Sequence, residues 1–114
     1  MFYVFRQNNS GGYFEINDDV TQFVIIEADS HEDANSRAVE IGIYFEGVDR
    51  DLDCSCCGDR WDEAWSGEGE PEPELYGKPI ASYRPWSHNP GQPYAYVYYK
   101  DGSKWSFIQK EDGQ

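Results

Sequence analysis

The residues with the clearest chemical potential lie close together, since all three cysteines fall within the stretch DCSCCGDRW, residues 53–61. Cys54 and Cys57 have the Cys-x-x-Cys-Gly spacing, in which two thiolates face one metal ion and the glycine lets the backbone turn beneath them. This arrangement supplies half of a tetrahedral zinc site. No second Cys-x-x-Cys follows, so Cys56, His88, an Asp carboxylate or a second chain would have to supply the other ligands.

The cysteines also have a purely structural interpretation. Free cysteines are among the residue types most often buried, so Cys54, Cys56 and Cys57 would then pack beneath a tight turn that Gly58 makes possible. A disulfide framework is not expected, because adjacent cysteines pair only with severe strain and one thiol would remain. A cysteine nucleophile would need a base, and the sequence holds no phosphate-binding loop or nucleophile elbow, so we expect no enzyme.

Two combinations of arginine and tryptophan offer a different chemistry. Arg60 directly precedes Trp61, and Arg84 lies two residues before Trp86. A guanidinium group can hold a phosphate, and an indole face can stack on a base. If the two loops that carry these residues meet over a sheet, they form, together with Tyr83, a pocket for a small nucleotide-type ligand.

The same residues have a structural alternative. Arg60 would form ion pairs with the nearest carboxylates, and the tryptophans would cover the core. The candidate partners of Arg60 are Asp59, Asp62 and Glu63. Trp61 and Trp65 are too large and apolar to be left in water without a reason.

The overall charge narrows the class of partner. The 114 residues include 9 basic and 22 acidic side chains, which gives a formal net charge of -13. Such a chain repels nucleic acid and anionic membranes, because binding to phosphates depends on Lys and Arg. We expect basic protein surfaces, cations or a locally held small ligand as partners. The chain has no segment apolar enough to span a bilayer and no signal peptide, which predicts a cytoplasmic protein.

The elements that would position these residues form one α+β domain, residues 1–114. Residues 2–5 and 21–28 are β-rich runs, and the second is apolar enough to be a central strand. Ser30 can cap a helix that ends near Gly42. Because 17% of the residues are aromatic, rings should fill much of the core.

Two long loops separate the helix from the end of the chain. An acidic loop, residues 49–75, is followed by a Pro/aromatic loop, residues 77–93, and by a C-terminal hairpin, residues 94–108, with Asp101-Gly102 in its turn. We expect residues 68–74 to form a solvated tether. The predicted fold is a small antiparallel sheet of about four strands covered by one helix.

The acidic loop suggests a second hypothesis about function. Its carboxylates would imitate nucleic acid and bind a basic host protein, since complementary charge speeds encounter and favours the right partner. The alternative is a solubilising face without a partner.

Several motifs together resemble a family of small uncharacterised proteins from tailed bacteriophages. The motifs are FRQNNSGG at 5–12, IEADS at 26–30, DCxCCGDRW at 53–61, YGKPI at 76–80 and YKDG at 99–102. Ser55 stands where we expect proline in this family, and a proline would stiffen the cysteine turn. The likeness covers nearly the whole chain and implies a viral origin, but it brings no catalytic residue or cofactor.

Small phage proteins of this kind often act on host defence. The resemblance and the residues together predict a non-enzymatic inhibitor of bacterial defence that sequesters a small nucleotide-type signalling molecule as a homo-oligomer. The predicted binding residues are Arg60, Trp61, Tyr83, Arg84 and Trp86. Two alternatives remain open: an acidic decoy that blocks a basic host protein surface, and a small interaction protein with zinc at Cys54, Cys56, Cys57 and His88.

Overall fold

The computed structural model describes residues 1–8, 14–53, 55–75, 77–80 and 93–108. This part of the chain forms a four-stranded sheet, one helix and a small two-stranded sheet. The predicted α+β class, with about four strands and one covering helix, is therefore confirmed. Within the described ranges, no helix has the length and apolar composition needed to cross a membrane.

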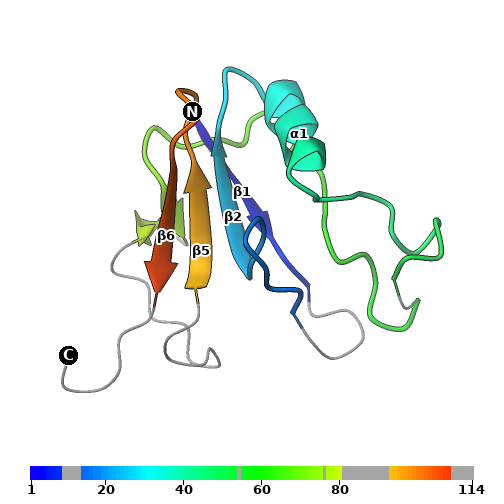
Figure 1. Cartoon of the computed structure of the whole chain (residues 1–114). Coiled ribbons are helices and arrows are strands. Elements are labelled where there is room, and N and C mark those ends of the chain that lie inside the picture. Colours follow the sequence, from blue (N-terminus) through cyan, green and yellow to red (C-terminus); the bar gives the residue numbers. More distant parts are fainter. Residues whose placement is uncertain (9–13, 54, 76, 81–92, 109–114) are drawn as a thin grey trace.

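Figure 1 colours the chain from blue at the N-terminus to red at the C-terminus. The elements along the chain are β1 (Phe2–Arg6), β2 (Phe23–Glu27), α1 (His31–Glu40), β3 (Glu74–Leu75), β4 (Lys78–Pro79), β5 (Pro93–Tyr98) and β6 (Lys104–Ile108). The large sheet has the order β1-β2-β5-β6, and β3 pairs with β4 in the small one.

The sheet is mixed, whereas the sequence analysis predicted an antiparallel one. β1 pairs antiparallel with β2, and β5 pairs antiparallel with β6. The central pair, β2 and β5, is parallel, with Val24 opposite Tyr96 and Ile25 opposite Val97. The physical reason is the connection between them, because a chain that leaves β2 through a helix and long loops can cross over and re-enter in the same direction.

Local signals determine both ends of α1. The Ser30 side chain accepts a hydrogen bond from the Asp33 N–H at 3.1 Å, as expected of a capping serine. The helix ends before Gly42, which has a φ of +109° that other residues rarely adopt. Ala34 and Ala38 are fully buried, so the small-residue side of α1 packs closely against the sheet.

Both faces of the sheet are covered. On the α1 side the buried cluster includes Tyr3, Phe5, Val24, Ile26, Tyr96 and Tyr98 from the strands. On the other side Phe2, Phe23, Ile25 and Val97 pack with Leu75 of β3 and with Ile80, which follows β4. Aromatic rings thus fill much of the core, as the composition predicts, and β2 is buried on both faces.

The predicted C-terminal hairpin is confirmed as β5 and β6. Its turn is closed by the Tyr99 N–H, which donates to the Ser103 carbonyl at 2.9 Å. Gly102 provides the positive φ of +93° that such a turn requires. The Asp101 carboxylate accepts from the Ser103 N–H at 2.8 Å and fixes the same turn.

The acidic loop is attached to the outer edge of β1 at two points. Phe2 and Glu70 exchange backbone hydrogen bonds of 2.7 and 2.9 Å, and the Asn8 N–H donates to the Arg60 carbonyl at 2.8 Å. The sequence predicts a solvated tether at residues 68–74: Glu68, Glu70 and Glu72 are indeed exposed, but the backbone of Glu70 is tied to β1. Because β1 is an edge strand, its unpaired backbone groups are available to bind the loop.

Candidate functional site

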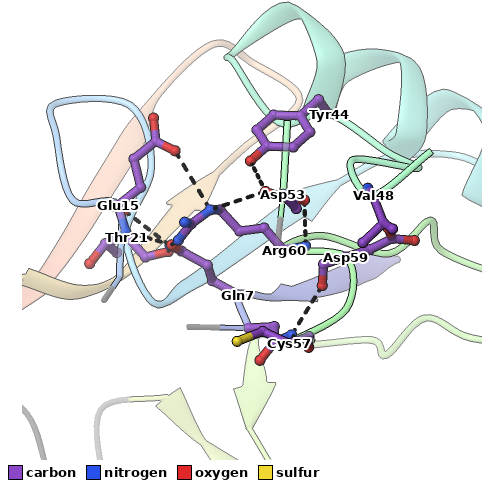
Figure 2. Close-up of polar contacts among 10 residues, drawn as sticks. Gln7, Glu15, Thr21, Tyr44, Val48, Asp53, Cys57, Asp59 and Arg60 are labelled. Atoms are coloured by element: carbon purple, nitrogen blue, oxygen red, sulfur yellow. Dashed lines mark hydrogen bonds and ion pairs between the residues drawn. The ribbon is translucent and has the colours of Figure 1, made fainter. Parts of the chain in front are cut away.

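The acidic loop is held by a buried polar network around Arg60, drawn in Figure 2. The Arg60 side chain is only 5% exposed, and its Nη1 donates to Gln7 Oε1 at 2.9 Å. Its Nε lies 3.7 Å from Asp53 Oδ1 and 3.9 Å from Glu15 Oε2. The guanidinium group therefore joins the acidic loop to the segments on either side of residues 9–13.

Asp53 is the buried acidic partner of Arg60 in this network. Its carboxylate is fully buried and accepts from the Tyr44 hydroxyl at 2.6 Å and from the Arg60 backbone N–H at 2.8 Å. Gly47 packs directly against it, and a Cβ at that position would overlap Asp53 Oδ2. Burial, followed by the hydrogen bond to Asp53, raises the pKa of Tyr44 to about 12.

Gln7 completes the network on the β1 side. Its amide donates to the Thr21 carbonyl at 2.9 Å and to the Glu15 carbonyl at 3.0 Å, while its oxygen accepts from Arg60 and from the Glu15 N–H. Gln7 is 3% exposed, so a buried polar side chain is satisfied by partners from three segments. The network therefore connects the acidic loop with residues 7, 15 and 21.

The structure corrects two of the predicted ligand-binding residues. Trp61 is 1% exposed and belongs to the core cluster on the α1 side, so its indole cannot stack on a base. Arg60 is buried against Asp53 and Gln7, which leaves its guanidinium group unable to hold a phosphate. The structural alternative is correct for Trp61, but the ion-pair partners it named for Arg60 are wrong.

The remaining predicted pocket and metal residues lie outside the described ranges. They are Cys54, Tyr83, Arg84, Trp86 and His88. The contributions of these five residues to a nucleotide pocket or to a zinc site therefore stay predictions.

Cys56 and Cys57 are described, and both are exposed. Their sulfur atoms lie 3.7 Å apart. The interpretation that they pack beneath a turn is wrong for these two residues, although Gly58 does adopt the positive φ, +85°, that the turn needs. Among the residues that the structure describes, no group of three or more His, Cys, Asp or Glu is arranged to hold a metal ion.

The outer surface of the acidic loop is strongly negative. Seven of its carboxylate residues are exposed: Asp49, Asp51, Asp62, Glu63, Glu68, Glu70 and Glu72. Arg50 is the one exposed basic residue of this loop, because Arg60 is buried and the sequence places no lysine between residues 49 and 75. The arrangement can attract cationic groups.

Trp65 differs from the expectation for a large apolar residue. Its side chain is 71% exposed, whereas Trp61 on the same loop is buried. A hollow of about 280 Å³ lies beside it, between α1 and residues 63–66. Tryptophan is enriched at protein interfaces relative to the rest of the surface, which makes this region a candidate contact surface.

Sequence reasoning missed Gln7, Asp53 and Glu15 as partners of Arg60, and Tyr44 as a partner of Asp53. One signal was available, since an arginine within a strongly acidic loop is expected to form ion pairs. Nothing in the sequence distinguishes Asp53 from the other nearby carboxylates, because the choice depends on how the loop folds back on Gly47 and Tyr44.

Comparison with known proteins identifies a family. The model of a family described as Domain of unknown function (DUF7296) matches residues 1–113. No curated protein and no solved structure gives a significant match.

Proposed function

The chain belongs to the DUF7296 family, and we propose that it is a non-enzymatic binding protein whose acidic loop docks on a basic surface of a partner protein. The observation that carries this proposal is the set of seven exposed carboxylates on a loop with one exposed arginine. The predicted setting, from the resemblance to phage proteins, is the cytoplasm of an infected bacterium, where the partner would belong to host defence.

Attachment of the loop favours binding. The backbone pair between Phe2 and Glu70 and the buried contacts of Arg60 fix two points of the loop before a partner arrives. A preformed surface loses less conformational entropy on association than a free tether does. Carboxylates held in this way can also steer a basic partner into the correct orientation.

The burial of Arg60 and Trp61 argues for protein binding and against nucleotide binding by this loop. A pocket for an anionic ligand needs accessible cationic groups, and the described part of the acidic loop exposes one, Arg50. The seven exposed carboxylates of the same loop would repel a phosphate that approaches them. The described residues thus favour the acidic decoy over the nucleotide pocket.

The test is binding of a fluorescent oligolysine peptide, followed by anisotropy at low and at physiological salt. The loop variant is Asp49→Asn/Asp62→Asn/Glu72→Gln, which neutralises three exposed carboxylates. Each exposed ion pair contributes about 0.2–1 kcal/mol, so the loop variant should bind roughly tenfold more weakly. The affinity of the wild type should fall as salt is added.

The matched control changes the net charge by the same amount, but at residues outside the acidic loop. Asp18→Asn/Asp19→Asn/Glu40→Gln neutralises three exposed carboxylates outside the acidic loop. The control variant should keep most of the affinity, because its three carboxylates are outside the acidic loop. Equal losses in both variants would mean that total charge, and no particular surface, attracts the peptide.

A further inference from the structure

Trp65 carries its exposed indole on a backbone that neighbouring groups hold in place. The Asn35 side chain, on α1, accepts from the Ala64 N–H at 2.8 Å and donates to the Ala64 carbonyl at 3.0 Å. The Trp65 N–H donates to Glu68 Oε1 at 2.6 Å, and the Glu68 N–H closes a turn onto the Trp65 carbonyl at 3.2 Å. Gly67 permits this turn with a φ of +90°.

The indole borders the hollow of about 280 Å³ between α1 and the acidic loop. The lining residues are His31, Glu32 and Asn35 from α1 and Glu63, Ala64, Trp65 and Ser66 from the loop. Glu32 and Glu63 are exposed carboxylates, and the one basic side chain in the lining is His31, whose Nε2 lies 4.0 Å from Glu32 Oε1. This volume lies at the lower end of the range of ligand sites, which starts at roughly 300 Å³, and it is large enough for a single side chain.

We infer that this hollow receives an arginine side chain of the basic partner, an assignment that rests on the proposed function. A guanidinium plane stacks on an indole face, and tryptophan gives the strongest cation–π contact of the aromatic residues. Glu32 and Glu63 can accept its N–H groups, since both border the same hollow.

The fixed backbone explains why Trp65 can act as an anchor. The preceding residue, Ala64, is hydrogen-bonded to Asn35, and the Trp65 backbone is hydrogen-bonded to Glu68, so the indole is presented without ordering a flexible loop first. Tryptophan and arginine are also the residue types that most often dominate the binding energy of protein interfaces. Trp105 on β6 is similarly exposed, at 60%, but it does not line this hollow.

The experiment compares oligoarginine and oligolysine peptides of equal length by fluorescence anisotropy. The wild type should bind oligoarginine more tightly than oligolysine. Trp65→Ala should weaken binding of oligoarginine by about threefold to thirtyfold and remove the preference, while Trp65→Phe keeps part of it. Glu32→Gln/Glu63→Gln should also lower the affinity for oligoarginine, and Trp105→Ala should leave both affinities unchanged.

The outcomes separate this inference from the proposed function. If the wild type binds neither peptide, the proposed function itself is wrong, and the arginine site falls with it. If both peptides bind and Trp65→Ala changes neither affinity, the acidic surface remains and the arginine site is refuted. A loss on Trp65→Ala that is equal for the two peptides would also refute it, because the contact would not select arginine.

Discussion

Replacement of Arg60 by alanine tests whether the acidic loop is anchored in the way the structure indicates. The substitution removes the hydrogen bond to Gln7 and the ion pair with Asp53. The Asp53 carboxylate stays fully buried, with the Tyr44 hydroxyl and the backbone N–H of residue 60 as its remaining donors. The variant therefore leaves a buried negative charge without its cationic partner.

The expected cost follows from these contacts. Removing one partner of a buried ion pair typically costs about 3–5 kcal/mol, and the two remaining donors place this case near 3 kcal/mol. Glu15 adds little, because its side chain is 48% exposed and screened by water. A domain of this size has an unfolding free energy of roughly 5–15 kcal/mol, so the loss is a large part of the total.

Urea unfolding followed by circular dichroism measures this loss. With a urea dependence of about 1–3 kcal/mol per M, the midpoint should fall by roughly 1–3 M. Arg50→Ala is the matched control, since Arg50 is an exposed arginine of the same loop and should change the stability by less than about 0.5 kcal/mol.

Two results would contradict the reasoning. A loss below about 1 kcal/mol for Arg60→Ala would mean that Asp53 does not depend on the guanidinium group. Unchanged stability together with loss of binding to a ligand would return Arg60 to the role of a ligand contact. A double variant, Arg60→Ala/Asp53→Ala, should cost less than the sum of the single variants, because both changes break one network.

Two further predictions concern aromatic residues. Trp61→Ala should lower the unfolding free energy by about 3–5 kcal/mol, because Trp61 is buried. Trp65→Ala should change it by less than about 0.5 kcal/mol, because Trp65 is exposed. Similar losses of the two variants in urea unfolding would contradict this difference in burial. The pKa values of Tyr44 and Tyr98 are raised to about 12, mainly by burial, from the ordinary value of 10.0. Because the folded state binds these protons more tightly, the stability they contribute is complete below pH 10 and is lost between pH 10 and 12. Ultraviolet titration of tyrosinate should show late-ionising tyrosines, fewer of them in Tyr44→Phe, and ionisation of every tyrosine near pH 10 would refute this.

The parts of the fold that depend on local sequence could be predicted. Ser30 and Gly42 mark the helix because capping requires only neighbouring residues. Asp101-Gly102 marks the hairpin for the same reason. The parallel pairing of β2 and β5 could not be predicted, because it depends on how a long intervening segment returns to the sheet.

In the candidate site, too, the features that depend on contacts distant in sequence could not be predicted. Arg60 has acidic neighbours next to it in sequence, yet Asp59 accepts from the Val48 N–H at 2.9 Å, and the guanidinium group contacts Asp53 and Glu15. The contrast between Trp61 and Trp65 is equally invisible in the sequence, since both are tryptophans in an acidic loop. Their exposure is set by the attachment of the loop to β1 and α1, which involves contacts distant in sequence.

The buried position of Arg60 has consequences for both stability and binding. An arginine on the surface of the acidic loop would neutralise part of its charge, whereas a buried one leaves seven exposed carboxylates opposed by Arg50 alone. The same burial fixes the loop against the sheet through Gln7 and Asp53. A single side chain thus makes the surface more negative and more rigid, and both changes favour association with a basic partner because they strengthen attraction and reduce the entropy lost on binding.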